Sequence, residues 1–357
     1  MNRAYNFNAG PSAMPLAVLK EAQAEFLDFQ GTGMSVIEIS HRSAEYSVLH
    51  QETKVLLRKL MEIPEDYEIL FCQGGGSTQF LMAAANFLTK KRAAYVNTGV
   101  WASKAMKEAA YYGEAYEAAS SADRNHSYIP QEFAILPETS YVHLTANNTI
   151  YGTEYPDFPK FDVPIICDMS SDILSRRVNV ADFDLIYAGA QKNLGPAGVT
   201  LAIVKKDFLA TARTDLPTML KYQTFADKDS LYNTPPVFAI YMVNKTLHWI
   251  ENQGGVDVIA ARNAEKAALI YDVIDASEGF YIGHAEKPYR SKMNITFNLQ
   301  TPEMEKDFIT RGKAEGFVGI NGHRSVGGCR ASCYNAVPMD ACQALADYMK
   351  QYQKDHQ

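Results

Sequence analysis

The sequence predicts an α/β fold followed by a smaller α+β part, and three features of its 357 residues support this. Short apolar segments alternate with amphipathic helical ones as far as Gly254-Gly255, which is the element order of α/β proteins. Several apolar segments end in glycine or small polar residues, as strands of α/β sheets do where ligands bind. After the double glycine this regular alternation stops. We therefore expect a hinge there, a large domain over residues 16–255, and a small α+β domain from residues 1–15 and 256–357.

Composition and charge are typical of a globular enzyme and argue against several other classes of protein. Hydrophobic residues make up 47% and charged residues 21%, as in an ordinary globular enzyme. The net charge of −7 and the lack of a long basic run argue against nucleic-acid binding. The five cysteines are scattered without CxxC spacing, so neither a disulfide framework nor a metal site is expected. No segment is apolar enough for a membrane span or a signal peptide, so we expect a cytoplasmic protein without a membrane partner.

The first helices are predicted from helical periodicity and from residues that start helices. An irregular opening precedes a helix expected over residues 16–29. His41 and Arg42 come directly before a second helix, expected over residues 44–61, for which Ser43 is the candidate N-cap. The histidine and arginine are then either solvated residues at a helix start or ligand-binding residues.

A glycine-rich turn joins the next strand to the next helix. The strand is expected over residues 68–72 and the helix over residues 80–88, with Gln73-Gly-Gly-Gly-Ser-Thr-Gln79 between them. Such a turn can bind a phosphate, because backbone N–H groups and the helix dipole favour an anion there. It has neither Walker A nor GxGxxG spacing, so nucleotide binding is not specifically supported. It could also be no more than a tight connection.

The remaining elements follow from the same signals. In the α/β part we expect strands over residues 93–97, 141–145, 163–168, 184–187 and 199–204, and helices over residues 102–112 and 237–253. Residues 207–233 are expected to form a long connection. In the α+β part we expect helices over residues 256–277, 301–316 and 339–352, and strands over residues 292–299, 317–320 and 327–332. Thr301-Pro is typical of an N-cap followed by proline at the first helical position.

One lysine stands where covalent chemistry is possible. Lys192 lies in Gly189-Ala-Gln-Lys-Asn-Leu-Gly-Pro-Ala-Gly198, between two predicted strands. A lysine held out of bulk water can lose its proton and attack a carbonyl. Asp168 ends another strand, and pyridoxal phosphate enzymes need both a lysine for a Schiff base and a carboxylate for the pyridine nitrogen. Together, the two residues indicate pyridoxal phosphate chemistry. Taken singly, Lys192 could be a surface lysine and Asp168 a helix N-cap.

Three further segments follow strands or are held rigidly. Trp101 could stack on a planar cofactor ring, or it could simply anchor the following helix. Thr149 lies in a small polar segment that could bond a ring substituent or form a turn. The prolines of Asn233-Thr-Pro-Pro236 fix the chain, either for structural reasons or to present Asn233 and Thr234 to a ligand.

Arginines near the C-terminus predict an anionic ligand. Arg330 lies in a strand of small residues, and His323 and Arg324 precede it. Arginine can bind a carboxylate or a phosphate through two hydrogen bonds at once. With the His41-Arg42 pair, these residues suggest a substrate with two anionic ends, although His323 and Arg324 could be a solvated hairpin tip.

Several motifs together resemble the phosphoserine aminotransferase family, in class V of the fold-type I pyridoxal-phosphate enzymes. They are Phe7-Asn-Ala-Gly-Pro-Ser-Ala-Met-Pro15, Ser40-His-Arg-Ser43, the lysine segment, Asn233-Thr-Pro-Pro236 and Gly327-Gly-Cys-Arg-Ala-Ser-Cys-Tyr-Asn-Ala336. The resemblance runs from about Tyr5 to the C-terminus. It implies a large domain with a central, mostly parallel seven-stranded sheet flanked by helices, a smaller α+β domain, and a homodimer with shared active sites.

The resemblance also implies a role for each candidate residue. Lys192 would bind pyridoxal 5'-phosphate as a Schiff base, and Asp168 would pair with the ring nitrogen. The cofactor phosphate would contact Gly76 and Ser77, together with Asn233 and Thr234 of the second subunit. Trp101 would stack on the ring, and Thr149 and Gln191 would contact its polar substituents. Arg330 would hold the substrate α-carboxylate, and the distal phosphate or carboxylate would be held by His41, Arg42, His323 and Arg324.

The implied activity is amino transfer from L-glutamate to 3-phosphohydroxypyruvate, giving O-phospho-L-serine and 2-oxoglutarate in L-serine biosynthesis. Two alternatives stay open. Another small-acid aminotransferase, of the alanine–glyoxylate or serine–glyoxylate type, needs no distal anion site. A phosphate-binding nucleotide module leaves Lys192 without a role. Some members of the family have arginine where this chain has Ser77, so one anion contact is absent here and the details of substrate binding differ.

Overall fold

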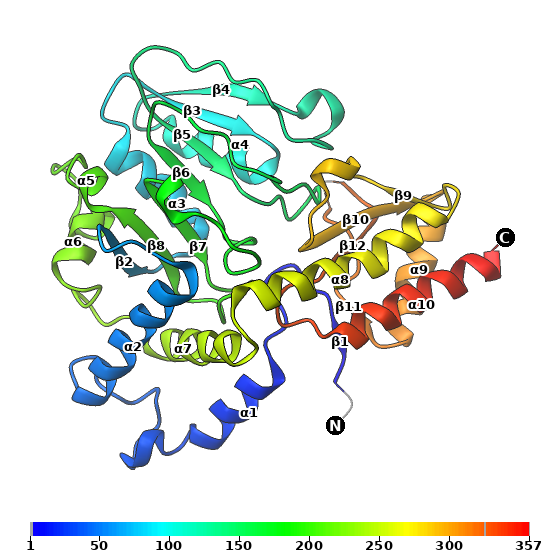
Figure 1. The fold of residues 1–357 in the computed structure, drawn as a ribbon, viewed down its shortest axis with the longest axis horizontal. Helices are drawn as coiled ribbons and strands as arrows, with labels where there is room; N and C mark the ends of the chain where they lie inside the picture. Colours follow the sequence, from blue (N-terminus) through cyan, green and yellow to red (C-terminus); the bar gives the residue numbers. More distant parts are fainter. Residues whose placement is uncertain (1–2, 325, 357) are drawn as a thin grey trace.

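The largest element of the computed structural model, which describes residues 3–324 and 326–356, is a seven-stranded sheet (Figure 1). In sheet order its strands are β2 (Tyr67–Cys72), β8 (Thr200–Lys205), β7 (Leu185–Gly189), β6 (Ile165–Asp168), β5 (Thr139–Thr145), β3 (Arg92–Asn97) and β4 (Glu114–Ser120). β8 is antiparallel to both of its neighbours, and the pairs from β7 to β4 are parallel. The expected mostly parallel seven-stranded sheet is therefore confirmed.

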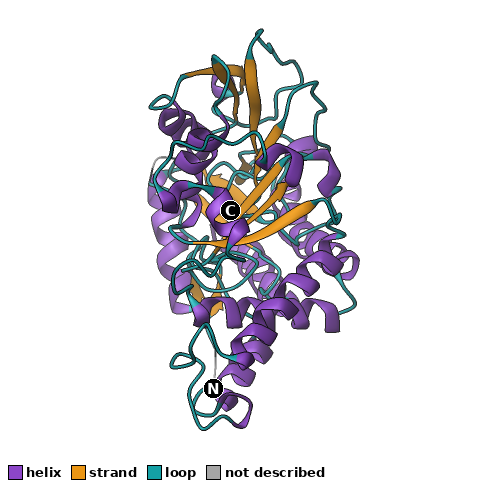
Figure 2. Cartoon of the chain, turned by 90° about the vertical axis from the view of Figure 1, so that its left-hand side faces the viewer, coloured by secondary structure: helices purple, strands orange, loops and turns teal. Residues whose placement is uncertain are grey.

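Helices cover both faces of this sheet, as the turned view in Figure 2 shows. One face carries α3 (Gly75–Phe87), α4 (Val100–Ala109), α5 (Lys206–Leu209) and α6 (Tyr222–Asp227). The other face carries α2 (Ala44–Met61), α7 (Val237–Asn252) and the start of α8 (Val256–Ala276). α1 (Leu16–Glu25) packs on α7 at the edge of this layer.

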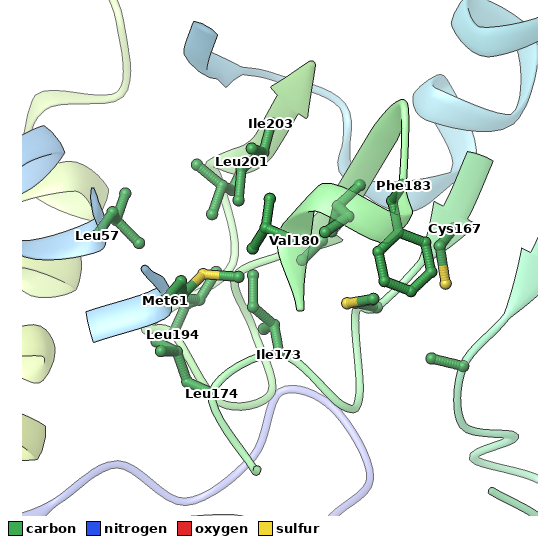
Figure 3. Packing of buried hydrophobic residues seen from close by; sticks show 14 of the residues in the cluster. Leu57, Met61, Cys167, Ile173, Leu174, Val180, Phe183, Leu194, Leu201 and Ile203 are labelled. Atoms are coloured by element: carbon green, nitrogen blue, oxygen red, sulfur yellow. The ribbon is translucent and has the colours of Figure 1, made fainter. Parts of the chain in front are cut away.

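The strands of the central sheet are apolar because helices cover both of its faces. Neighbouring residues of a strand point to opposite faces, so Ile166 of β6 packs with the first helix layer and Cys167 with the second. A strand that is buried on both faces has to be apolar throughout, which is why the segments are continuous apolar runs. Figure 3 shows part of the second layer, where Leu57 of α2 lies in the same cluster as Leu201 and Ile203 of β8.

A smaller sheet has its own core. Its antiparallel strands are ordered β12 (Cys329–Ser332), β10 (Asn294–Leu299) and β9 (Tyr281–Gly283). α8, α9 (Pro302–Ala314) and α10 (Met339–His356) pack with it through a cluster that includes Ile270, Phe297 and Leu345. β1 (Tyr5–Asn6) pairs with β11 (Phe317–Val318), which places the N-terminal segment among the C-terminal elements. In Figure 1, α8 extends from beside α7 to this smaller sheet.

Two predicted helix starts are confirmed in detail. The side chain of Ser43 accepts a hydrogen bond from the Tyr46 N–H and caps α2. The side chain of Thr301 accepts one from the Met304 N–H and caps α9, with proline at the first helical position. Both caps use a hydroxyl to satisfy an N–H that has no partner within the helix.

Three expectations about helices are wrong. The helix expected over residues 16–29 ends at Glu25, and the chain then turns through a 3-10 segment, where Asp28 accepts a hydrogen bond from the Gly33 N–H. The helix expected from residue 80 already begins at Gly75, inside the glycine-rich turn. The connection expected over residues 207–233 contains most of α5, a 3-10 turn and α6.

The sequence pattern does not predict β1, β4 or β9. These strands are short or lie at sheet edges with partly exposed side chains, so no buried apolar run marks them. The two strands expected over residues 317–320 and 327–332 form β11 and β12, but in different sheets, because each pairs with a segment distant in sequence. None of the helices described combines the length and apolar character needed to cross a bilayer.

Candidate active site

A cavity of ≈ 280 Å³ lies at the edge of the central sheet where β5, β6 and β7 end. The carboxyl ends of parallel strands meet at one edge, so residues distant in sequence come together there. Seven predicted site residues line it: Gly76, Ser77, Trp101, Thr149, Asp168, Gln191 and Lys192. A larger cavity of ≈ 520 Å³ lies between α1, α2 and α7 and is lined by none of the predicted site residues.

The amine of Lys192 points into this cavity. Its Nζ donates a hydrogen bond to Thr149 Oγ1 at 2.6 Å and lies 6.0 Å from the centroid of the Trp101 ring. Burial lowers the pKa of Lys192 to about 8, the negative charge of Asp168 opposes this shift, and the positive charge of Arg330 adds to it. A lysine with such a pKa is neutral near pH 7 far more often than an ordinary lysine, and the neutral amine is both a nucleophile and a base.

The turn that carries Lys192 is held by the N-terminal segment. The Ser12 N–H donates to the Gln191 carbonyl at 3.0 Å, and the Ser12 hydroxyl donates to the Lys192 carbonyl at 2.5 Å. Two hydrogen bonds to successive carbonyls restrict the backbone on which the lysine stands. Sequence reasoning missed Ser12, although the residue belongs to the opening motif.

Asp168 ends β6 with its side chain 7% exposed. Burial raises the pKa of Asp168, while hydrogen bonds from Ser170 and the positive charge of Lys192 lower it. The Ser170 N–H donates to the carboxylate at 2.9 Å, and the Ser170 hydroxyl oxygen accepts from the Gly189 N–H at 3.0 Å. Ser170 thus ties the carboxylate to the end of β7, the strand that leads to Lys192.

The glycine-rich turn forms the start of α3 at the wall of the cavity. Gly74 and Gly75 have φ of 88° and 67°, a backbone region that side chains rarely adopt. A Cβ on Gly74 would also lie 1.9 Å from the Thr78 hydroxyl oxygen. The first turn of a helix presents N–H groups without intrahelical partners, and this first turn contains no acidic residue. An anion beside Gly76 and Ser77 would therefore find free N–H donors and a favourable helix dipole.

Trp101 stands in the first turn of α4 and gives the cavity a flat aromatic wall. Its Nε1 is buried and has no hydrogen-bond partner within residues 3–324 and 326–356. The preceding Gly99 has φ of 144°, and a Cβ there would lie 2.2 Å from Asn148 Nδ2. Only glycine lets the chain enter the helix so close to the segment after β5.

The arginine of the smaller sheet contacts a residue of the cavity wall. Arg330 of β12 donates from Nη1 to the Thr149 carbonyl at 3.1 Å, so it lies beside the residue that binds Lys192. Its Nε is buried and finds no acceptor among the described residues. Burial lowers the pKa of His323, and the charges of Arg330, Arg324 and Lys104 lower it further. Arg330, Arg324 and Lys104 therefore place positive charge near His323, whose lowered pKa favours the neutral imidazole.

Seven predicted residues are not among those that line the cavity: His323, Arg324 and Arg330, described above, and four others. Asn233 and Thr234 are exposed before α7, where the Thr234 carbonyl accepts a hydrogen bond from Gln73 at 3.4 Å. Arg42 is exposed before α2, and the buried Nε2 of His41 has no partner in the part of the chain that the structure describes. A single copy of the chain thus brings together only part of the predicted site.

Other cavity residues were not singled out from the sequence. They are small polar or aromatic residues that follow strands or stand on α3: Phe80, Thr145, Asn147, Ser170 and Ser171. Most lie within a few residues of Thr149 or Asp168, so a polar segment after a predicted strand was the available signal. That signal does not tell which of the neighbouring side chains face the cavity.

Comparison with known proteins agrees with this geometry. The sequence matches the aminotransferase class-V family over residues 4–345. Phosphoserine aminotransferase from Lysinibacillus sphaericus (strain C3-41) is 55% identical over 359 residues, covering 99% of each chain. Among solved structures, phosphoserine aminotransferase from Bacillus circulans subsp. alkalophilus is 52% identical with a TM-score of 0.98, covering 99% of each chain.

A more distant structure extends the comparison. Phosphoserine aminotransferase from Trichomonas vaginalis, solved with bound PLP, is 36% identical with a TM-score of 0.93. It covers 98% of this chain and 100% of its own. The likeness includes both sheets and the segments that line the cavity, because it spans nearly the whole chain. The chain belongs to the class-V aminotransferase family.

Proposed function

We propose that the protein transfers the amino group of L-glutamate to 3-phosphohydroxypyruvate, giving O-phospho-L-serine and 2-oxoglutarate in L-serine biosynthesis. One observation carries this proposal. A lysine whose pKa is lowered to about 8, a buried carboxylate and the start of a helix line one cavity, with an arginine beside it. Full-length relatives at 52–55% identity are phosphoserine aminotransferases, which supports the choice of substrates.

The residues of the cavity fit pyridoxal 5'-phosphate as the cofactor. The anion site at the start of α3 suits its phosphate, through Gly76 and Ser77. Trp101 would stack on the ring, Asp168 would face the ring nitrogen, and Thr149 and Gln191 would contact the polar substituents. When bound, this cofactor supplies an aldehyde that reacts with amines and a ring that takes up the electron pair left by breaking a bond at the substrate Cα.

The residues of the chain supply the proton transfers and the orientation. Nζ of Lys192 takes the proton from the substrate Cα as general base, which requires the neutral amine that burial favours. Burial raises the pKa of Asp168, the hydrogen bonds from Ser170 oppose this shift, and the carboxylate would pair with the ring nitrogen of the cofactor. Arg330 would bind the substrate α-carboxylate, because its Nε is buried without an acceptor in the described residues.

We also propose a homodimer in which each active site uses residues of both copies. Asn233 and Thr234 would reach the cofactor phosphate of the second copy, and His41 and Arg42 would join His323 and Arg324 at the distal phosphate or carboxylate. Exposure of Arg42, Asn233 and Thr234 supports this, because these residues are free to contact another copy. Large hydrophobic residues are also exposed on and after α1: Leu16, Leu27, Met34 and Ile37.

Two further proposals concern the chain as a whole. The residues 16–255 would form one domain and residues 1–15 and 256–357 the other, which the separate hydrophobic clusters around the two sheets support. The protein would act in the cytoplasm, where free cysteines stay reduced, and all five cysteines are buried and unpaired.

The visible absorption spectrum of the purified protein tests the function. We expect a yellow protein that O-phosphoserine bleaches and alanine does not. A yellow protein that responds better to alanine would keep the cofactor and favour an alanine–glyoxylate or serine–glyoxylate type of activity. A protein that stays colourless after addition of pyridoxal phosphate would refute the role of Lys192 and leave a phosphate-binding module as the alternative.

A Lys192→Ala variant separates the amine from the rest of the cavity. We expect turnover to fall at least about a hundredfold, the lower range for loss of a general base. Undiminished turnover would refute the mechanism. A matched variant, Lys205→Ala, removes a lysine at the far end of the following strand and should leave turnover unchanged.

A further inference from the structure

A second lysine lies close to the cavity wall. Lys104 stands on α4 three residues after Trp101, a spacing that places two side chains on the same side of a helix. Its Nζ lies 4.7 Å from the centroid of the Trp101 ring, and Trp101 lines the cavity. The Lys104 side chain is exposed and makes no ion pair with any of the described acidic residues. Neither sequence reasoning nor the proposed set of substrate contacts includes it.

Lys104 is one of three positive charges near His323, together with Arg324 and Arg330. Burial lowers the pKa of His323 most, and the charges of Arg330, Arg324 and Lys104 then act in the same direction. The three charged side chains come from α4, from the segment before β12 and from β12 itself. Like charges brought together repel each other. An anion that binds between these side chains offsets their mutual repulsion, so such an arrangement favours anion binding.

We propose that Lys104 is a specificity-determining residue, whose ammonium group faces the distal anion of the substrate and favours a phosphate over a carboxylate. This inference rests on the proposed function, in which both anions use one distal site. A phosphate monoester carries a charge of about −1.5 to −2 at neutral pH, whereas the side-chain carboxylate of glutamate carries −1. The attraction to one fixed positive charge scales with the charge of the ligand. A lysine acts here as a point charge and needs no paired hydrogen-bond geometry.

The same helix provides a matched control. Lys107 is exposed one turn further along α4 and forms no ion pair with a described residue. It is not among the charges that shift the pKa of His323. Lys104→Gln and Lys107→Gln therefore change the net charge and the helix equally, but only the first removes a charge beside the distal site.

The test measures kcat and KM of the holoenzyme for 3-phosphohydroxypyruvate and for L-glutamate. In Lys104→Gln we expect the KM for the phosphorylated substrate to rise about fivefold and that for glutamate about twofold, the scale of one partly screened ion pair. kcat should change little, and the difference between substrates should shrink at high salt. Lys104→Arg should restore the lost discrimination, and Lys107→Gln should match the parent protein.

Three outcomes would overturn the inference. Equal losses for the two substrates would show that Lys104 does not distinguish their charges. A fall in kcat with unchanged KM, or a changed visible spectrum of the bound cofactor, would show that it acts through the position of Trp101. The same changes in Lys107→Gln would indicate a general charge effect. If the parent protein turns over neither substrate, the proposed function fails instead, so the two failures are distinguishable.

Discussion

Lys266 of α8 is a charged residue in the core, and its burial predicts how the stability of the protein depends on pH. Its side chain is 0% exposed. Nζ donates to the carbonyls of Cys333 at 3.0 Å, Tyr334 at 2.6 Å and Val337 at 3.1 Å. All three acceptors belong to the segment that follows β12 and its arginine. The lysine thus fixes this segment to α8 through neutral carbonyls, and no carboxylate of the described residues forms an ion pair with it.

The size of the change in unfolding free energy follows from the pKa of Lys266. Burial lowers the pKa of Lys266 to about 8; the neighbouring thiols of Cys342 and Cys333 oppose this shift and Arg262 adds to it. The unfolded chain therefore binds more protons than the folded one between that pH and the ordinary lysine value, so stability rises with pH there. Between about pH 7 and about pH 9.5, the contribution of Lys266 to the unfolding free energy should rise by about 2 kcal/mol.

The assay compares the parent protein with Lys266→Met by urea unfolding at both pH values and one protein concentration. Methionine keeps the length and removes the titrating group, so other ionisable groups largely cancel in the difference. We expect the parent to gain about 2 kcal/mol over the variant on going to the higher pH. The comparison is repeated in a Cys342→Ala background, so that the nearby thiol does not contribute to the pH dependence. A difference that does not change with pH would refute the reasoning, because the lysine would then titrate as if it were solvated.

Three further predictions concern other sites. Ser43→Ala should cost about 1 kcal/mol in urea unfolding, because the hydroxyl caps α2 by accepting from Tyr46, and an unchanged midpoint would contradict the cap. Gly99→Ala should weaken binding of pyridoxal phosphate to the apoprotein in a fluorescence titration, because its Cβ would lie 2.2 Å from Asn148 Nδ2; parent-like affinity would show that the helix start adapts. Asp168→Asn should lower turnover roughly a hundredfold with the cofactor still bound, the scale of losing one aligned charge, and parent-like turnover would exclude an electrostatic role.

The predictions that succeeded rest on signals that act over a few residues. A buried strand needs a short apolar run, and a helix start needs a residue such as Ser43 or Thr301 whose side chain accepts an N–H three positions on. Asp168 and Lys192 were found because each follows such a run, and strand ends of a parallel sheet share one edge. The edge strand β4 was missed because its partly exposed side chains give no apolar run.

The amino-acid sequence is sufficient to locate most helices and strands, the glycine-rich turn at the start of α3, and the lysine and carboxylate at strand ends. The reason is that local backbone hydrogen bonding and burial depend on neighbouring residues. The sequence does not determine that β8 lies antiparallel between β2 and β7, or that Ser12 and Arg330 meet the segments carrying Lys192 and Thr149. The pairing of β8 with β2 and the contacts of Ser12 and Arg330 join residues more than a hundred positions apart. The chain entropy lost in closing a loop changes only slowly with its length, so local patterns leave many pairings open. The packing of both sheet faces and of the smaller sheet selects among those pairings.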